Sequence, residues 1–443
     1  MKEVPFKAND IRGLYPKEVN EKLFYNVGKA IPCIISSNKI AIGMDIRLSS
    51  KSLFNSLSKG LMELGVSVLD LGYCDTPYTY FISGKYKIPV CMITASHNPK
   101  QYNGLKIVNK GCIPLSEEQI SHLLEVLDKE EYGKSKNKGK IKKFNKQKEY
   151  AHFLLSQIKG KELSKMKVVV DCSNGMASFV VPLVLSKIPI EVIYINKKPD
   201  GNFPAHVPNP AIPSNMKQLQ QAVLEEKADL GIIYDGDCDR VAFVDNKGSI
   251  VSSSTVASIL AHYYLDKSPG SKVVHTVNMS INLQESIRTY SGVPIMAQIG
   301  QRMMKAAMIK NKAILGAEYS GHYYFKDFWY ADSGILASLI FYSILSELKT
   351  PLSLISKNFS KYHSTGEINY SVKDRERSFT NVRRYFKALN PVQEILLDGY
   401  AAVLKDGYVT LRKSNTENVI RVTLESKNLH FLQSIKRDID RII

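Results

Sequence analysis

Short apolar runs, each followed by a tight turn and then a helical pattern, recur along the chain. Residues 39–44 lead into Asp45 and a helix-like stretch ending near Leu64, and residues 167–170 lead into the turn 171–175 and an apolar helical pattern. Residues 228–234 and 271–277 are further strand-like runs of the same kind. Strands that alternate with helices predict α/β domains with largely parallel sheets. In such sheets ligands bind at the loops that follow the carboxyl ends of strands, so these loops are the places to search for chemistry.

The chain is long enough for several such domains. Its 443 residues are 44% hydrophobic and 23% charged, which excludes disorder over the whole length. The clearest compositional break is the basic segment 129–149, and beyond about residue 362 a helix-rich region gives way to a β-rich one. We expect four domains of ordinary size, with boundaries 1–147, 148–249, 250–362 and 363–443.

The net charge of +18 leaves nucleic acids, acidic membranes and phosphorylated small molecules open as partners. Nine Lys and three Glu in segment 129–149 supply a third of this charge. No RNA-binding or zinc-finger motif accompanies the segment, and lysines that contact phosphates carry no sequence specificity by themselves. We interpret the segment as a solvated, exposed connection or hairpin and expect no nucleic-acid partner.

Membrane insertion and secretion have little support in the sequence. The apolar stretches 179–195 and 335–345 are interrupted or too short to reach the ~20 apolar residues of a membrane span. The first residues contain no apolar signal region, and the six cysteines are dispersed without a C-x-x-C pair. We therefore expect a cytoplasmic protein with no membrane partner, disulfide framework or structural zinc.

The first polar motif, Thr94–Pro99 (TASHNP), follows the strand-like run 88–93. Its Asn-Pro fixes a sharp turn that can expose the Ser96 hydroxyl beside His97, and Lys106 follows ten residues after Ser96. Taken alone, a Ser-His pair usually reflects only ordinary turn chemistry. No G-x-S-x-G motif is present, so acyl transfer has little support.

The second motif is a carboxylate triplet, Asp235, Asp237 and Asp239, directly after the apolar run 230–234. Three carboxylates at alternate positions around Gly236 can converge on a hard cation such as Mg²⁺. An EF-hand is excluded, because its sixth and twelfth positions would be Arg240 and Asn246 rather than Gly and Glu. A solvated acidic turn is the alternative, but carboxylates this close repel each other unless a cation offsets them.

Two later loops carry weaker signals. The loop 316–322 brackets Glu318, Ser320 and His322 between glycines, and side chains of these types recognise sugar hydroxyls. The loop after residue 411 gathers two guanidinium groups with small polar side chains, a set that suits a phosphate dianion, although a helix cap or an ordinary turn is the competing explanation. The members of this second set are Arg412, Ser414, Asn415, Thr416 and Arg421.

Taken together and in this order, the motifs closely resemble the α-D-phosphohexomutase family, in particular its phosphomannomutase/phosphoglucomutase branch. The resemblance spans nearly the whole chain through six segments, 6–13 (FKANDIRG), 94–106, 200–210 (DGNFPAHVPNP), 235–240, 316–322 and 412–421. It implies three related α/β domains with mixed sheets and a smaller β-rich C-terminal α+β domain, arranged around a central cleft.

The resemblance also implies a reaction. Ser96 would carry a phosphoryl group and pass it between C1 and C6 of a hexose phosphate through a hexose 1,6-bisphosphate, which is both intermediate and activator. Mg²⁺ would be held by phosphorylated Ser96 and the three aspartates. Lys106, His97 and Arg12 would assist proton transfer, and surrounding cations would lower the pKa of Lys106. The substrate-binding set would be Arg240, Glu318, Ser320, His322, Arg412, Ser414, Asn415, Thr416 and Arg421.

The chain departs from the branch at several positions. Asn278 and Gln301 stand where the branch usually has Lys and His, Cys238 replaces a Gly of the metal loop, and Asn418 replaces a Pro of the phosphate loop. Asn278 and Gln301 leave open a phosphosugar-binding protein that has lost turnover. A phosphoglucosamine mutase is also open but less favoured, because Tyr319 stands where that enzyme usually has Gln. The sequence selects neither glucose nor mannose, and it predicts no oligomeric state.

Overall fold

The computed structural model describes residues 5–6, 10–414 and 418–443. The chain forms two compact units. The first contains the chain up to Val251 together with Ser320–Ser353, and the second contains Ser252–Tyr319 and Leu354–Ile443.

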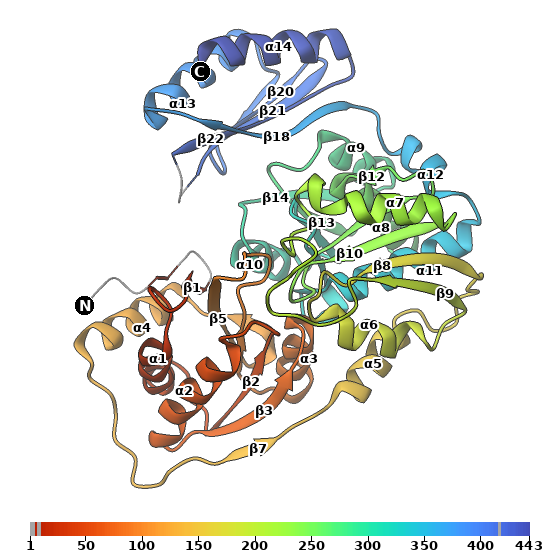
Figure 1. Ribbon diagram of the computed structural model, residues 1–443. Helices are drawn as coiled ribbons and strands as arrows, with labels where there is room; N and C mark the ends of the chain where they lie inside the picture. The colour runs from red at the N-terminus through yellow and green to blue at the C-terminus, as the bar shows by residue number, and fades with distance from the viewer. Residues whose placement is uncertain (1–4, 7–9, 415–417) are drawn as a thin grey trace. The chain divides into compact units, whose positions relative to one another are not determined.

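The first unit begins with a mixed sheet in the order β1-β5-β4-β2-β3-β7, with β6 paired to β5. Strands β2, β3 and β4 are parallel, and β5 runs antiparallel to β4 and β1. Helices α1 and α2 lie on one face and α3 on the other (Figure 1). The elements are β1 (Ile11–Leu14), α1 (Glu21–Ile34), β2 (Lys39–Met44), α2 (Ser50–Glu63), β3 (Ser67–Tyr73), α3 (Thr76–Tyr86), β4 (Val90–Ile93), β5 (Tyr102–Asn109), β6 (Ile113–Pro114), α4 (Glu117–Lys129) and β7 (Ile141–Lys143).

Two glycines set the distance between α1 and α2. A Cβ on Gly28 would lie 2.3 Å from the Leu57 carbonyl oxygen, and one on Gly60 would lie 2.2 Å from that of Tyr25. Any side chain at either position would force the helix backbones apart.

The basic segment 129–149 is largely exposed, as expected of solvated surface. It also contains the short strand β7, which pairs parallel to β3 at the sheet edge rather than in a hairpin of its own. Every residue of β7 is exposed, so the lysines of this edge strand stay in water while its backbone pairs with β3.

A second mixed sheet in the first unit has the order β12-β11-β10-β8-β9. β10 is parallel to β8 and antiparallel to β11, so the loop between β10 and β11 is a tight reversal. Helix α7 covers one face, where Val244 lies in the core, and Phe243 on the other face packs on Phe341 of α11 with ring centroids 4.3 Å apart. The remaining elements of the first unit are α5 (Gln147–Ser156), β8 (Met166–Asp171), α6 (Ala177–Leu185), β9 (Ile190–Ile195), α7 (Lys217–Glu225), β10 (Leu230–Tyr234), β11 (Val241–Asp245), β12 (Ile250–Val251), β16 (Tyr323–Phe325), β17 (Ala331–Asp332) and α11 (Gly334–Leu348). Of these, β16 and β17 form an antiparallel pair outside this sheet.

The second unit contains a parallel set of strands, with β13 between β14 and β15. Helices α8 and α9 pack on each other beside these strands. The elements are α8 (Ser253–Lys267), β13 (Lys272–Thr276), α9 (Ile281–Thr289), β14 (Val293–Ala297), α10 (Gln301–Asn311) and β15 (Leu315–Ala317). Helix α12 (Leu352–Asn358) spans the point where the chain re-enters this unit.

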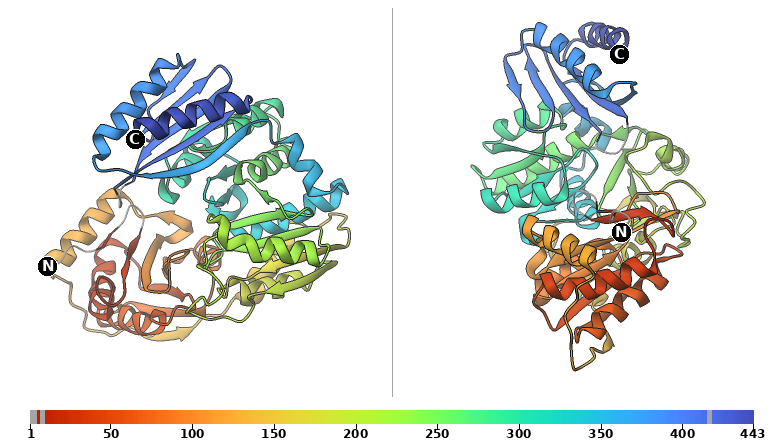
Figure 2. Two further views of the ribbon diagram at one scale, coloured as in Figure 1. Left: turned by 45° about the horizontal axis from the view of Figure 1, so that its top comes forward. Right: turned by 90° about the vertical axis from the view of Figure 1, so that its left-hand side faces the viewer.

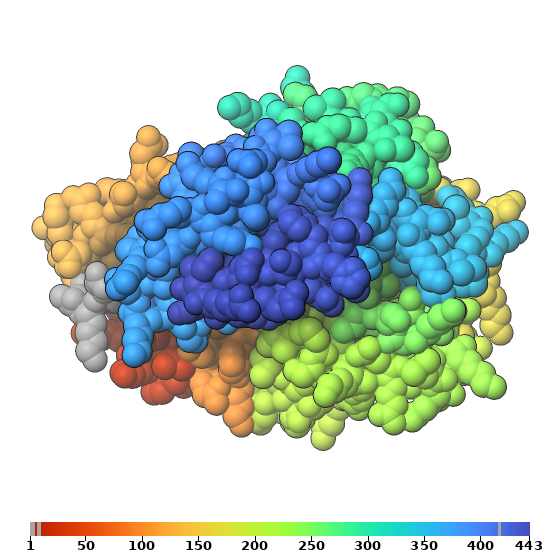
Figure 3. All heavy atoms as spheres, turned by 90° about the horizontal axis from the view of Figure 1, so that it is seen from above, coloured from red at the N-terminus to blue at the C-terminus, as the bar shows by residue number. Residues whose placement is uncertain are grey.

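The C-terminal part of the second unit is an antiparallel sheet in the order β18-β22-β21-β20-β19. Helices α13 and α14 cover the same face of this sheet (Figure 2), and their side chains form the outer surface of the domain (Figure 3). The elements are β18 (His363–Ser371), α13 (Arg375–Ala388), β19 (Gln393–Ile395), β20 (Tyr400–Leu404), β21 (Gly407–Lys413), β22 (Val419–Ser426) and α14 (Leu429–Ile442).

This architecture confirms the expected fold class, three α/β domains with mixed sheets and a β-rich α+β domain at the C-terminus. Among the described residues, no single helix is long and apolar enough to cross a membrane. Helices α11 and α12 pass that test only when taken as a pair, and they are bent by 95° relative to each other. Most of α11 is buried within the protein.

Candidate active site

Ser96 lies in the loop between β4 and β5, at the carboxyl end of β4. Its backbone has a left-handed φ of 49°, and its N–H donates to the Thr94 hydroxyl oxygen at 2.8 Å. The turn directs the buried Ser96 Oγ to Asp235, where it donates to Oδ2 at 2.8 Å, and Oγ also lies 3.3 Å from the His97 Nδ1. The sharp turn expected around this serine is confirmed by its φ.

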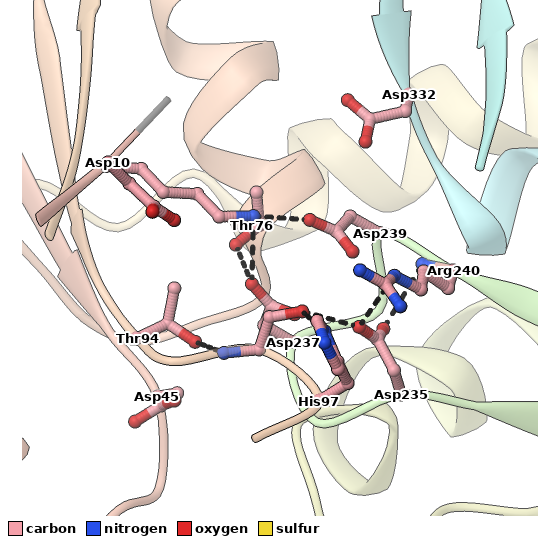
Figure 4. A network of polar contacts seen from close by, with 12 residues as sticks. Asp10, Asp45, Thr76, Thr94, His97, Asp235, Asp237, Asp239, Arg240 and Asp332 are labelled. Atoms are coloured by element: carbon pink, nitrogen blue, oxygen red, sulfur yellow. Dashed lines mark hydrogen bonds and ion pairs between the residues drawn. The ribbon is translucent and has the colours of Figure 1, made fainter. Parts of the chain in front are cut away.

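Asp235, Asp237 and Asp239 follow β10, and all three are fully buried. One carboxylate oxygen from each lies within 4.8 Å of the others, and the Thr76 hydroxyl donates to Asp237 Oδ2 at 2.5 Å. Figure 4 shows the three carboxylates turned toward one small region, with Thr76 beside Asp237. Burial raises the pKa of Asp235 well above its ordinary value, and the negative charges of Asp239 and Asp237 add to this effect.

The oxygens of this cluster fit a divalent cation. Oδ1 of Asp237 and Oδ1 of Asp239 are buried, and within the described part of the chain neither has a hydrogen-bond partner. Buried carboxylate oxygens without partners are costly unless a cation binds them, and hard oxygen donors suit Mg²⁺. The residues present could therefore hold a metal ion.

The buried Lys106 ammonium lies directly against the aspartates. Its Nζ donates to Asp239 Oδ2 and lies 3.4 Å from Asp237 Oδ2. Burial alone would lower the pKa of Lys106, but the two carboxylates outweigh burial and hold this pKa well above the ordinary lysine value. This corrects the expectation of a lowered pKa, because the groups in contact with the ammonium are anions rather than cations.

The lowering of a pKa by nearby cations, which was expected for Lys106, occurs at His97 instead. Burial lowers the pKa of His97 well below its ordinary value, and the positive charges of Arg240 and Arg12 lower it further, so the ring is neutral at neutral pH. Arg12 lies on β1, where it donates to Asn98 Oδ1 at 2.9 Å and to Asp10 Oδ2 at 2.5 Å. Arg12 is thus tied to the loop that carries Ser96.

Arg240 and His322 form a connected group beside Asp235. The Arg240 backbone N–H donates to Asp235 Oδ1 at 3.1 Å, and its side-chain Nε donates to His322 Nε2 at 2.9 Å. Because Nε2 accepts this bond, the ring proton lies on Nδ1, which donates to Asp332 Oδ2 at 2.6 Å. The sequence did not single out Asp332, which is buried in β17 ten residues after His322, nor Thr76 at the start of α3.

The chain passes from the second unit to the first within the loop 318–322. Ser320 and His322 belong to the first unit, while the buried Glu318 belongs to the second. Gly321 has a φ of 90°, and its carbonyl accepts from the Val241 N–H at 3.1 Å, which fixes this end of the loop to β11.

Arg412 and Arg421 face each other across β21 and β22. Like charges in directly opposed positions repel unless anions lie between them. Here Glu367 of β18 lies 3.8 Å from both guanidinium groups, and Asp398 lies 3.5 Å from Arg412 Nε.

The neighbouring loop begins at the buried Ser414, whose carbonyl accepts from Arg375 at 2.6 Å. Asn415 and Thr416 lie outside the described residues. The described part of the expected phosphate site therefore supplies two opposed guanidinium groups on β21 and β22, the strands that flank this loop.

The structure shows the surroundings of three positions at which the sequence departs from the phosphomannomutase/phosphoglucomutase branch. Asn278 is buried after β13 and accepts from the Thr276 hydroxyl at 2.8 Å, and Gln301 is the first residue of α10. Cys238 has a left-handed φ of 64° inside the aspartate loop, a conformation that glycine adopts without strain. Burial and the surrounding carboxylates raise the pKa of the Cys238 thiol well above its ordinary value, which keeps it unreactive.

Comparison with known proteins extends the resemblance over the chain. Models of the phosphoglucomutase/phosphomannomutase family match in sequence, with α/β/α domain I at residues 3–134, domain II at 148–248, domain III at 252–362 and the C-terminal domain at 367–442. A phosphomannomutase of Escherichia coli K12 is 34% identical over 433 residues, covering 95% of this chain and 94% of the relative. A phosphomannomutase of Methanocaldococcus jannaschii is 34% identical over 443 residues, covering 99% and 97%.

A solved structure shares the fold over the full length. The crystal structure of a phosphoglucomutase/phosphomannomutase family protein from Burkholderia thailandensis matches with a TM-score of 0.90 at 27% identity, covering 100% of this chain and 97% of the other. With four consecutive domain matches, curated relatives above 30% identity over almost their whole length and this shared architecture, the chain belongs to the phosphoglucomutase/phosphomannomutase family.

Proposed function

We propose that the chain catalyses the reversible transfer of a phosphoryl group between C1 and C6 of a hexose phosphate, glucose or mannose, with Ser96 as the carrier. Hexose phosphate mutase activity follows from the family. The observation that carries the assignment of Ser96 is its buried hydroxyl, which donates to Asp235 within a cluster of three aspartates, beside Lys106 and a neutral His97.

Each half of the reaction exchanges one oxygen–phosphorus bond. In the first half, the bond between Ser96 Oγ and phosphorus breaks, a bond forms to the free C6 oxygen of the hexose 1-phosphate, and the hydroxyl proton passes to a base. In the second half, the C1 phosphoryl group of the reoriented 1,6-bisphosphate moves to Ser96 Oγ, and the C1 oxygen takes up a proton. Free hexose 1,6-bisphosphate would act as activator by restoring the phosphate on Ser96.

The side chains around Ser96 supply charge and proton transfer. The neutral His97 imidazole, 3.3 Å from Oγ, can accept a proton, while the protonated Lys106 and the Arg12 and Arg240 guanidinium groups offset charge on the transferring phosphoryl group. Mg²⁺, held by Asp235, Asp237, Asp239 and the Ser96 phosphate, would neutralise further charge on the phosphoryl oxygens.

The substrate must bind in two orientations, so the phosphate that is not reacting needs a site of its own. We assign that site to Arg412, Ser414, Asn415, Thr416 and Arg421. A phosphate dianion between the opposed Arg412 and Arg421 would neutralise their two positive charges. Glu367 now offsets these charges only from 3.8 Å. Glu318, Ser320 and His322 are assigned to the sugar hydroxyls. The four domain boundaries expected from the sequence, the cytoplasmic location and the absence of nucleic-acid and membrane partners stay predictions.

Steady-state turnover of glucose 1-phosphate, mannose 1-phosphate and glucosamine 1-phosphate, with Mg²⁺ and glucose 1,6-bisphosphate present, tests this proposal. We expect turnover of glucose or mannose 1-phosphate that Ser96→Ala abolishes and Ser83→Ala preserves, since Ser83 is a buried serine of the same unit that donates to the Asn109 carbonyl. Faster turnover of the glucosamine phosphate would favour that substrate instead. Tight binding of all three sugar phosphates without turnover would favour the alternative, a phosphosugar-binding protein that has lost turnover.

A further inference from the structure

Arg47 lies in the loop after β2, and only 1% of its surface is exposed. Both of its terminal nitrogens point into the Ser96 loop and donate to backbone carbonyls. Nη1 donates to the Pro99 and Tyr102 oxygens at 2.7 and 2.9 Å, and Nη2 donates to the Ser96 and Asn98 oxygens at 2.8 and 2.6 Å. A single buried guanidinium group therefore binds four carbonyls across one seven-residue stretch.

Asp45 holds this guanidinium group from the other side. Arg47 Nε donates to Asp45 Oδ2 at 3.1 Å, while Asp45 Oδ1 accepts from the Arg47 N–H and from the Ser50 hydroxyl. All five N–H donors of the guanidinium group thus have acceptors. A lysine offers three donors without the planar fork, so it could not replace this pattern. Figure 4 shows Asp45 on the Thr94 side of the loop, away from Asp235 and Asp239.

Phe203 covers the guanidinium group from the segment 200–210. The Arg47 guanidinium carbon lies 5.1 Å from the centre of the Phe203 ring, and Phe203 has a left-handed φ of 49°. A Cβ on Gly201 would lie 2.5 Å from the Ile46 carbonyl oxygen, so a side chain there would push this segment off the Arg47 loop. The segment is itself fixed by Asn174, whose carbonyl accepts from the Asp200 N–H at 2.9 Å.

We infer that Arg47 and Phe203 are positioning residues that hold the Ser96 loop in the geometry needed for phosphoryl transfer. This inference rests on the proposed function of Ser96, and it gives a role to the motif 200–210. At the left-handed turn, the buried hydrogen bond from Arg47 Nη2 to the Ser96 carbonyl would be lost if Arg47 were absent, and that carbonyl would lose its donor. Displacement of a reacting group by 1 Å can cost about a hundredfold in rate, so a looser loop lowers kcat before it alters substrate binding.

The test compares Arg47→Lys and Phe203→Leu with Phe203→Tyr and Phe243→Leu. Phe203→Tyr keeps a ring over Arg47, and Phe243→Leu removes a fully buried ring from the same unit at its contact with Phe341. One readout is hydrogen–deuterium exchange in peptides covering residues 94–104, which does not require activity. The other is kcat and KM for the preferred hexose 1-phosphate.

We expect Arg47→Lys and Phe203→Leu to speed exchange in residues 94–104 and to lower kcat by roughly tenfold or more, with KM changed less than about threefold. Phe203→Tyr is expected to retain wild-type exchange and kcat, and Phe243→Leu to leave exchange in this loop unchanged. The inference is wrong if Phe203→Leu matches Phe243→Leu in both readouts. If Arg47→Lys does not fold, the Phe203 variants decide the question. A wild-type protein without mutase activity would refute the proposed function, while the exchange data would still show whether Arg47 and Phe203 order the loop.

Discussion

Replacing Lys106 with Met removes the positive charge that lies against two buried aspartates. At 3.4 Å from Asp237 Oδ2, with an effective dielectric constant of about 20, this one ion pair has a Coulomb energy of about 5 kcal/mol, and the closer pair with Asp239 contributes at least as much. Dehydration of the ammonium group offsets much of this gain. Breaking a buried pair by removing one partner costs about 3–5 kcal/mol, because the other charge is left uncompensated.

The expected loss corresponds to a fall of roughly 6–10 °C in the unfolding transition of the first unit, at about 2 °C per kcal/mol for a large domain. Thermal unfolding in EDTA measures it, with Lys110→Met as the control, because Lys110 is exposed at the end of β5. In the Lys106 variant, added Mg²⁺ would be the principal counter-charge for the aspartates. We therefore expect Mg²⁺ to raise its transition more than that of the wild type. The reasoning fails if the two variants unfold within about 2 °C of each other in EDTA, or if Mg²⁺ stabilises wild type and Lys106→Met equally.

Three further outcomes follow from single groups. Burial raises the pKa of Asp75 to about 7 in the folded protein, so the free energy of unfolding is expected to fall by up to about 4 kcal/mol as pH rises from about 4 to 7. Denaturant unfolding at a series of pH values measures this fall, and Asp75→Asn should make it smaller. Cys33 is exposed and the other five thiols are buried, so a thiol reagent is expected to modify one cysteine in the native protein and six after unfolding. Fast labelling of Cys238 in the native protein would contradict its burial in the loop that carries the three aspartates. Arg421→Met is expected to raise KM for hexose 1-phosphate by roughly tenfold or more, because it removes one of the two guanidinium groups assigned to the non-reacting phosphate. Acetyl phosphate has no second phosphate, so its phosphorylation of Ser96, measured without any sugar bisphosphate, is expected to be unchanged.

The parts of the site that the sequence indicated are local. Ser96, Asp235, Asp237 and Asp239 lie in loops that follow apolar strands, so strand ends marked these loops as candidates, and the family resemblance then assigned the role of Ser96. The strand at 39–44 was placed to the residue for the same reason, since its apolar run ends at Asp45.

The missed partners are distant in the chain. Thr76 binds Asp237 across 161 residues, and the Arg47 guanidinium reaches carbonyls about fifty residues away, so only the folded backbone brings these groups together. The direction of the Lys106 pKa was wrong for the same reason. The sequence could place cations near Lys106, but it could not show that two carboxylates lie closer to the ammonium group. The left-handed φ of Cys238 explains why a glycine is usual there, and a single sequence with cysteine gives no sign of it.

Transfer of one phosphoryl group through Ser96 is the central claim, and peptide mass spectrometry measures it directly. Dephosphorylated protein is incubated with glucose 1,6-bisphosphate and Mg²⁺, mapped for phosphate, and then chased with excess hexose monophosphate. The account predicts one phosphoryl group per chain, on Ser96, that the chase removes as hexose bisphosphate, and none in Ser96→Ala. Turnover of a hexose phosphate without phosphate on Ser96, or with the phosphate on another residue, would contradict it.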